Sequence, residues 1–295
     1  MGSDGPLLLT VLGSATPYPS VDNPCSGYLV SSGATRVWVD AGTGTLAPLQ
    51  RHVRLDELDA IWISHLHADH SADLLTAYYG ALFADIQLAA PITLFGPPGI
   101  ADRLAHFLTN GAERSPVESA FAVHELYDGH RAVVGGLTLT TGAVSHGIPA
   151  FAVRIETETR EGTREETGET AREETAREET ARGGVNSLVY SGDTAPCAAL
   201  TRLAAGCDVL LCEADSDRPP AEGAAVHHTP EDAGDTATAA GAGRLIVTHV
   251  GRFLTPRQAV TRAAARFAGP VEHAEPGATF TVGPPPASAG STRGR

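Results

Sequence analysis

Short apolar runs alternate along the chain with glycines and with longer Ala- and Leu-rich stretches, a rhythm typical of an α/β protein. Each short run is bounded by turn residues and therefore predicts a strand. The predicted strands cover residues 7–12, 28–30, 36–40, 60–64, 92–95, 137–141, 151–155, 187–191, 209–213, 245–248 and 278–282. The Ala- and Leu-rich stretches predict helices over residues 71–84, 99–108, 196–205, 230–240 and 256–267. Thr229 and Thr255 each precede a proline, which predicts a threonine cap with proline at the first helical position.

Two segments depart from this rhythm. Residues 156–184 hold 10 glutamates and 5 arginines and nothing apolar larger than alanine, and the pentad Ala-Arg-Glu-Glu-Thr recurs at Ala171 and Ala176. Such a composition cannot bury enough surface to offset its ordering entropy, so we expect a solvated insert. Residues 283–295 are rich in Pro, Gly and Ser and predict a disordered tail. Residues 1–282 then form a single domain interrupted by the insert.

Composition and charge narrow the classes of protein that fit. The chain has 295 residues, 42% of them hydrophobic, which allows a sizeable core. Its formal net charge of −14 argues against a surface that coats nucleic acid. No basic leader and no apolar stretch of about 18 to 20 residues is present, so we expect a cytoplasmic protein without a membrane span. Four cysteines without paired spacing predict buried free thiols rather than disulfides.

A dense cluster of metal-binding residue types follows the predicted strand at 60–64. His65 and His67 are two positions apart in an extended segment, so their side chains can reach one cation. Asp69 and His70 come after a turn and are better placed for a second cation. The cluster therefore predicts a site for two metals.

Three further residues supply the ligands that two metals need, and each lies at the end of an apolar strand. They are His146, Asp193 and His249. Gly192 lets the backbone turn before Asp193, whose two carboxylate oxygens can bridge cations about 3.5 to 4 Å apart. Bound divalent cations would also reverse the sign of the local potential in this acidic chain, which favours an anionic substrate.

In this order, the His-x-His-x-Asp-His cluster, the lone histidine, Ser-Gly-Asp-Thr and Leu-Ile-Val-Thr-His resemble the metallo-β-lactamase superfamily over about residues 7–282. The resemblance implies a four-layer αββα sandwich with the metals at one edge of the sheets. It implies that His65, His67 and His146 hold the first metal, that Asp69, His70 and His249 hold the second, and that Asp193 bridges them. Asp40 matches an aspartate that supports the metal loop from behind.

Further stretches resemble the ribonuclease Z-like group, namely residues 12–17, 95–99, 146–150, 211–214 and 227–233. In that group a glutamate and a later histidine cooperate in protonating the leaving oxygen. Glu213 matches the glutamate, although Cys212 and Asp215 replace the usual neighbours, and His227 matches the histidine better than His228 does. We therefore expect Asp69, Glu213 and His227 to be the catalytic residues.

The resemblance implies phosphodiester hydrolysis, in which paired cations activate water and His227 protonates the departing alkoxide. Ribonuclease Z grips its RNA with a basic arm, but the insert at the same point of this chain is acidic and would be repelled by phosphates. We therefore expect a small phosphodiester substrate such as 3′,5′-cyclic AMP, as in the similar actinobacterial-type cyclic-nucleotide phosphodiesterases. Precursor tRNA or another RNA is the alternative, and esters or lactones without a nucleotide come third.

The ligand set leaves the identity of the metals open. Imidazole and carboxylate suit zinc, and they also suit manganese and iron. We expect two Zn²⁺ ions first, with Mn²⁺ or Fe²⁺ as alternatives. Family resemblance also implies a homodimer. A non-catalytic scaffold of the same fold is a further alternative, which the complete set of seven ligands disfavours.

Overall fold

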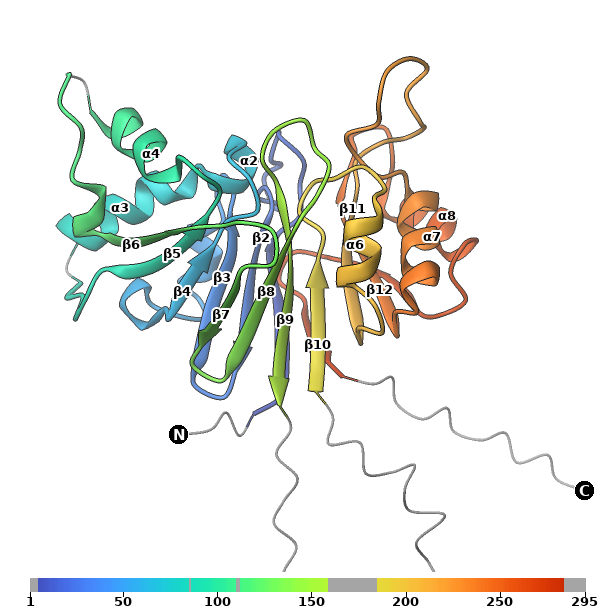
Figure 1. Ribbon diagram of the computed structural model, residues 1–295, viewed down its shortest axis with the longest axis horizontal. Helices are drawn as coiled ribbons and strands as arrows, with labels where there is room; N and C mark the ends of the chain where they lie inside the picture. Colours follow the sequence, from blue (N-terminus) through green and yellow to red (C-terminus); the bar gives the residue numbers. More distant parts are fainter. Residues whose placement is uncertain (1–4, 85, 110–111, 159–184, 284–295) are drawn as a thin grey trace, which may run out of the picture.

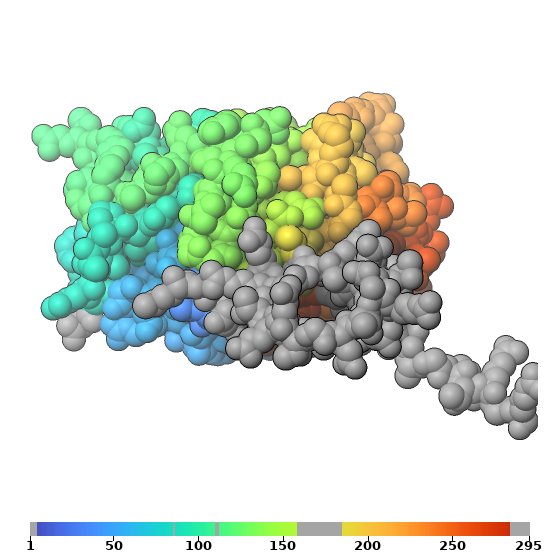
Figure 2. Space-filling view, turned by 60° about the horizontal axis from the view of Figure 1, so that its bottom comes forward, coloured from blue at the N-terminus to red at the C-terminus, as the bar shows by residue number. Residues whose placement is uncertain are grey.

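The computed structural model describes residues 5–84, 86–109, 112–158 and 185–283. Within these residues two seven-stranded sheets face each other, and helices cover their outer faces (Figure 1). This arrangement confirms the four-layer αββα sandwich. On the face shown in Figure 2, blue to green residues lie toward one side and yellow to red residues toward the other.

The first sheet comes mainly from the N-terminal half of the chain. Its strands, in spatial order, are β14 (Thr279–Val282), β1 (Leu7–Gly13), β2 (Gly27–Ser32), β3 (Thr35–Ala41), β4 (Ala60–Trp62), β5 (Ile92–Gly96) and β6 (Phe121–Glu125). Strands β14 to β3 pair antiparallel, whereas β3 to β6 pair parallel.

The second sheet repeats this mixed arrangement. Its strands, in spatial order, are β13 (Val271–His273), β12 (Arg244–Val250), β11 (Val209–Ala214), β10 (Val185–Tyr190), β9 (Phe151–Glu158), β8 (Leu137–Ala143) and β7 (Arg131–Val134). Strands β13 to β10 pair parallel, whereas β10 to β7 pair antiparallel. The carboxyl ends of parallel strands form ligand-binding edges in α/β folds, and each sheet provides one.

The apolar runs are continuous because their strands are buried on both faces. Val37 and Val39 of β3 point into the layer between the sheets, while Trp38 between them packs against the outer helices. In the second sheet, Leu188 of β10 points into the layer between the sheets, and Val189 packs against the outer helices. Three apolar layers therefore hold the sandwich together, one between the sheets and one under each set of helices.

The helices lie on the outer faces, as Figure 1 shows. Over the first sheet lie α1 (Leu46–Leu49), α2 (Ala68–Ser71), α3 (Asp73–Phe83) and α4 (Ile100–Leu108), and over the second lie α6 (Ala198–Leu203), α7 (Pro230–Ala240) and α8 (Pro256–Ala264). Thr229 and Thr255 cap α7 and α8 with their side-chain oxygens, each followed by proline. Both predicted caps are confirmed.

The sequence pattern missed three strands, β6, β7 and β13. All three are short strands at sheet edges, and their partly exposed residues interrupt the apolar runs on which the prediction depends. The predicted helix at 71–84 begins instead at Asp73, because the short helix α2 precedes it and carries Asp69 and His70. Strand β4 ends at Trp62, two residues earlier than predicted.

The boundary predicted for the insert is wrong at its start. Glu156 and Thr157 belong to β9, where they pair with Ser187 and Asn186 of β10, and the last pair joins Glu158 to Val185. Backbone hydrogen bonds to β10 keep these positions in a strand despite their polar side chains. Residues 159–184 and 284–295 lie outside the described part of the chain. They include most of the predicted solvated insert and nearly all of the predicted disordered tail.

The described residues bear on two smaller predictions. Cys25, Cys207 and Cys212 are buried free thiols as predicted, whereas Cys197 is free but only partly buried. Among the described residues, no helix has both the length and the apolar character that a membrane span requires.

Candidate metal centre

The residues of the candidate site gather at one edge of the sandwich, at the carboxyl ends of parallel strands from both sheets. Asp40 is the last residue but one of β3, and the segment that holds His65 follows β4. Asp193 follows β10, and His249 lies near the end of β12. Helix α2, near the top in Figure 1, supplies Asp69 and His70 to the same edge. Residues up to 209 positions apart in sequence, from Asp40 to His249, thus come together because both sheets present the same edge.

A first group of possible ligands consists of His65, His67 and His146, with Asp193 beside them. His67 Nδ1 lies 3.0 Å from His65 Nε2 and 3.2 Å from His146 Nε2. Asp193 Oδ2 lies 3.7 Å from His65 Nε2 and 3.9 Å from His146 Nε2. His67 is exposed, whereas the other three side chains are buried. These four side chains could hold one cation that solvent can reach.

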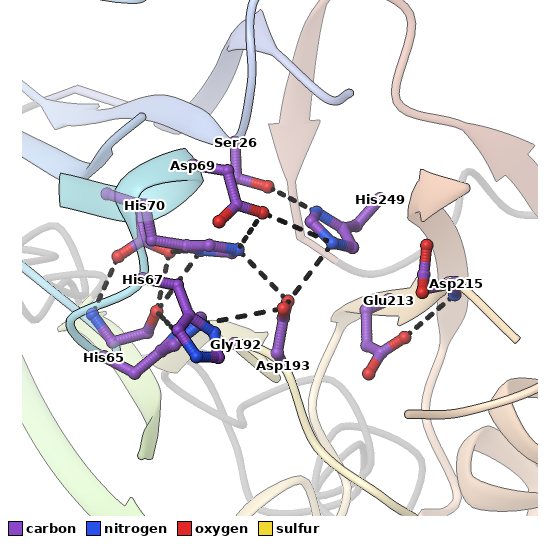
Figure 3. Close-up of polar contacts among 12 residues, drawn as sticks. Ser26, His65, His67, Asp69, His70, Gly192, Asp193, Glu213, Asp215 and His249 are labelled. Atoms are coloured by element: carbon purple, nitrogen blue, oxygen red, sulfur yellow. Dashed lines mark hydrogen bonds and ion pairs between the residues drawn. The ribbon is translucent and has the colours of Figure 1, made fainter. Parts of the chain in front are cut away.

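A second group consists of Asp69, His70 and His249, again with Asp193, and all of these side chains are buried. His70 Nε2 lies 3.3 Å from Asp193 Oδ1 and 3.5 Å from Asp69 Oδ2. His249 Nε2 lies 3.5 Å from Asp193 Oδ2 and 3.8 Å from Asp69 Oδ2. Asp193 belongs to both groups, and Figure 3 shows it between the histidines of the loop and His249. The structure therefore brings all seven predicted ligands together.

Three polar atoms of this site are buried without any hydrogen-bond partner among the described residues: His70 Nε2, His249 Nε2 and Asp193 Oδ1. Buried polar atoms are nearly always paired, so such a cluster calls for a ligand. Imidazole nitrogens and a carboxylate oxygen converging at these distances are a donor set for divalent metals. The clusters thus fit the divalent metals that the sequence predicts.

The charge balance of the site points the same way. Burial lowers the pKa of His65 well below its ordinary value, so its ring is neutral and can act as a ligand. Burial alone would also lower the pKa of His70, but Asp193 and Asp40 outweigh it and raise that pKa well above its ordinary value. Burial alone would raise the pKa of Asp193, yet His249 and His70 hold it well below the usual range. A positive charge, whether proton or metal, is therefore favoured at this point.

Asp40 orients the cluster from behind. Its carboxylate accepts hydrogen bonds from His70 Nδ1 at 2.7 Å, from the backbone nitrogen of Ser64 at 2.7 Å and from the hydroxyl of Tyr190 at 2.8 Å. The bond to His70 fixes its proton on Nδ1 and leaves Nε2 to face the site. Asp40 therefore occupies the supporting position that the resemblance implies.

Other histidines are oriented by groups that the sequence reasoning missed. Ser26 Oγ hydrogen-bonds His249 Nδ1 at 2.9 Å, and the Val226 carbonyl accepts from His146 Nδ1 at 2.9 Å. Ser64, next to the histidine cluster in sequence, lies 3.0 Å from His65 Nδ1. Its position beside the cluster was a usable signal, whereas Ser26 lies 223 residues from its partner and gave none.

Glu213 and His227 form a pair beside the metal cluster. Glu213 is buried and accepts hydrogen bonds from His227 Nδ1 at 2.9 Å and from the backbone nitrogens of Thr194 and Asp215 at 3.0 and 2.9 Å. Burial raises the pKa of Glu213 to about 7, against the effect of the bond from His227. Burial alone would lower the pKa of His227, but the same hydrogen bond to Glu213 raises it to about 9. His227 therefore holds its proton at neutral pH, 3.9 Å from Asp193 Oδ2.

His228 has a different environment. It is fully buried, its Nδ1 donates to the Thr194 carbonyl at 2.6 Å, and its Nε2 lies 3.1 Å from the Thr236 hydroxyl. Both ring nitrogens are therefore occupied by groups away from the metal cluster. Of the two neighbouring histidines, His227 is the one that faces Asp193.

Comparison with known proteins bears on the family of the chain. Residues 35–250 match the Beta-lactamase superfamily domain. An uncharacterized protein of Mycobacterium tuberculosis is 32% identical to the chain, covering 93% of the chain and 92% of its own length. The ribonuclease Z of Myxococcus xanthus is 30% identical, covering 94% of the chain and 97% of its own length.

Solved structures show the same fold. The metallo-beta-lactamase fold protein YhfI from Bacillus subtilis has a TM-score of 0.72 at 22% identity, covering 94% of this chain and 99% of that one. Human tRNase Z, short form, has a TM-score of 0.64 at 19% identity with the same two coverages. A diphosphatase of the PhnP family has a TM-score of 0.67 at 17% identity, covering 94% and 98%.

Proposed function

Because the chain belongs to the beta-lactamase superfamily and is a metal-dependent hydrolase of the ribonuclease Z-like group, we propose that it hydrolyses small phosphodiesters at two metal ions. The observation that carries this proposal is the Glu213–His227 pair, which lies beside Asp193 at the centre of the ligand cluster. Hydrolysis of a phosphodiester expels an alkoxide, which needs a proton. A protonated histidine next to the metal ligands suits that step.

In this proposal His65, His67 and His146 hold one ion, Asp69, His70 and His249 hold the other, and Asp193 bridges them. When bound, a pair of divalent cations activates water and neutralises the charge of the phosphate. The three unpaired buried atoms of the cluster support this assignment. Zinc is our first choice because imidazole and carboxylate ligands suit it, and manganese and iron suit the same ligands.

The side chains around the ligands have roles of their own. His227 holds the proton that the leaving oxygen takes, and Glu213 keeps the ring oriented through the bond to Nδ1. Nε2 of His227 lies on the other side of the ring, 3.8 Å from Asp215 Oδ2. Asp69, as a ligand of the second ion, belongs to the same reaction centre. Asp40 positions His70 without touching the substrate.

We favour a 3′,5′-cyclic nucleotide, with cyclic AMP first, over a large RNA. The reason is charge: the chain carries a net −14, and residues 156–184 hold twice as many glutamates as arginines, so a long phosphate backbone would be repelled. Precursor tRNA stays as the second candidate, because the 30% identical relative from Myxococcus xanthus is a ribonuclease Z. Esters or lactones without a nucleotide come third.

A substrate panel tests the proposal. Cyclic AMP, cyclic GMP, adenosine 2′,3′-cyclic phosphate and precursor tRNA are each incubated with the protein, once with Zn²⁺ and once with Mn²⁺. We expect rapid hydrolysis of a cyclic nucleotide and little trimming of precursor tRNA. Efficient trimming of the tRNA with untouched cyclic nucleotides would reverse the order of the two candidates, and no hydrolysis of any phosphodiester would refute both.

We also propose a homodimer, which family resemblance implies. The resemblance does not identify the surface through which two copies would meet. Light scattering coupled to size-exclusion chromatography measures the mass in solution, and a mass of one chain at working concentrations would contradict the proposal.

A further inference from the structure

An open groove of about 680 Å³ lies next to the candidate site, on the far side of His227. Its walls come from three loops, which follow strands β1, β11 and β12. The side chains that matter here are Tyr18 from the first loop, Asp215 and Arg218 from the second, and Arg252 and Phe253 from the third. Pockets for small ligands have about this size.

The groove borders His227, the proposed proton donor. Asp215 lines the groove, and its Oδ2 lies 3.8 Å from His227 Nε2. On its other side, His227 Nδ1 contacts Glu213 and lies 3.9 Å from Asp193 Oδ2. In Figure 3 Asp215 lies beside Glu213. A phosphodiester whose phosphorus lies at the metal ligands, with its leaving oxygen at His227, therefore has the rest of its leaving group directed into the groove.

Hydrogen bonds and close packing connect the groove walls to the candidate site. The thiol of Cys25 donates to the Thr16 carbonyl at 3.2 Å, and Cys25 precedes Ser26, which holds His249. The backbone nitrogen of Asp215 donates to Glu213 at 2.9 Å. Gly251 lies so close to this loop that an added Cβ would be 1.8 Å from the Asp215 carbonyl oxygen, so only glycine fits. The groove therefore has a defined position relative to the site.

Two exposed aromatic rings line the groove. Tyr18 is 89% exposed and Phe253 is 72% exposed, so both rings can offer a face to a ligand in the groove. Nucleobases stack on aromatic side chains in just such open positions, and every base has a flat face to offer. Two rings at one groove therefore fit a planar aromatic ligand better than an aliphatic one.

The groove lining balances two arginines, Arg218 and Arg252, against two aspartates, Asp215 and Asp217. Arg252 places its guanidinium 4.6 Å from the centre of the Phe253 ring, and in the part of the chain that the structure describes it enters no ion pair. Asp217, also in the groove, already pairs with Arg262 at 3.1 Å. Arg252 is therefore available to a ligand, either to its polar edge or to an anionic group.

We propose that this groove binds the nucleobase of a nucleotide substrate, with the base stacked against Tyr18 and Phe253 and with Arg252 at its polar edge. This inference rests on the proposed function, since it names which part of a phosphodiester lies beyond His227. Tyr18, Arg252 and Phe253 are then determinants of substrate specificity. A groove of this kind favours nucleotides over phosphodiesters that have no aromatic group.

Two substrates with the same reactive group test the proposal. Adenosine 2′,3′-cyclic phosphate and glycerol 1,2-cyclic phosphate share a five-membered cyclic phosphodiester, and only the first carries a base. We expect Phe253→Ala and Tyr18→Ala each to lower kcat/KM for the adenosine substrate about tenfold, mainly through KM, because one stacking contact is lost. The glycerol substrate should change less than about twofold.

Phe83→Ala is the matched control, since Phe83 is 71% exposed at the end of α3 and far from the groove in sequence and fold. It should change neither substrate. Equal losses for both substrates in Phe253→Ala, or no loss for either, would overturn the proposal.

Binding of adenosine 5′-monophosphate, measured by titration calorimetry, separates this inference from the proposed function. We expect Phe253→Ala to weaken binding about tenfold and Phe83→Ala to leave it unchanged. If the wild type hydrolyses none of the phosphodiesters tested, cyclic AMP included, but shows this pattern of binding, the proposed function fails and the groove stands. If the wild type does not bind the nucleotide, or all three proteins bind it equally, the groove proposal is wrong.

Discussion

The two ligand groups that share Asp193 differ in how their buried atoms are satisfied. In the first group the Nδ1 atom of His67 lies within hydrogen-bond distance of His65 Nε2 and of His146 Nε2, and His67 reaches solvent. In the second group His70 Nε2 and His249 Nε2 are buried without a hydrogen-bond partner among the described residues. Leaving such atoms unpaired costs about 1 to 3 kcal/mol each. We therefore expect the second group to depend on a bound cation for its stability more than the first.

Removing the carboxylate of Asp193, which both ligand groups share, should affect both groups alike. Asp193→Ala takes one ligand from each group, so we expect both ions to be lost and turnover of bis-p-nitrophenyl phosphate to fall by at least about 10³. Metal content by mass spectrometry and the hydrolysis rate measure the two effects. Asp235→Ala, which removes an exposed carboxylate paired with Arg266, is the control and should keep both. Unchanged activity in Asp193→Ala would refute the two-metal assignment.

A change at His227 should lower turnover while leaving both ligand groups intact. His227→Gln cannot donate the proton, so we expect turnover of a cyclic nucleotide to fall by about 10² or more. Bis-p-nitrophenyl phosphate should lose less than about tenfold, because its leaving group departs as a stable anion without a proton. Metal content should stay at the wild-type value. A loss of metal, or equal losses for both substrates, would make His227 a structural residue.

Single substitutions within each group should sharpen the contrast between them. His249→Ala removes a buried ligand, and we expect the metal-loaded protein to lose roughly 3 kcal/mol of stability, which corresponds to a fall in Tm of about 6 to 12 °C. His67→Ala removes an exposed ligand and should lower Tm by less than about 3 °C while releasing the first ion. Scanning calorimetry with metal analysis compares the two variants. The same fall in Tm for both would contradict the difference in burial.

The smallest effect is expected at the opposite edge of the sandwich. Because Glu158 pairs with Val185, residues 159–184 can be replaced by Asn-Gly, which suits a two-residue hairpin between antiparallel strands. We expect hydrolysis of a cyclic nucleotide to change less than about twofold, since β9 and β10 reach the site only at their other ends. A large loss would mean that the replaced segment shapes the site.

Features marked by residues close together in sequence could be predicted, whereas contacts between residues far apart in sequence could not. The cluster from His65 to His70 was recognisable because its residues are dense in sequence, and His146, Asp193 and His249 because each ends an apolar strand. Edge strands such as β7 were missed because half-exposed residues break the apolar pattern. Tyr190 and Ser26 were missed because their partners lie 150 and 223 residues away, and no local pattern marks such contacts.

The backbone at Asp40 and His249 carries a consequence for how this protein can change over time. In the described part of the chain these are the two residues other than glycine with positive φ, at 55° and 46°. Such a conformation costs an ordinary residue roughly 1 to 3 kcal/mol, and glycine would relieve most of it. Glycine at Asp40, however, would leave three buried donors, on His70, Ser64 and Tyr190, without their acceptor. At His249 the bond to Ser26 is the one hydrogen bond of the ring in the described part of the chain, so a histidine retained there against the backbone strain would indicate selection for the chemistry of the site.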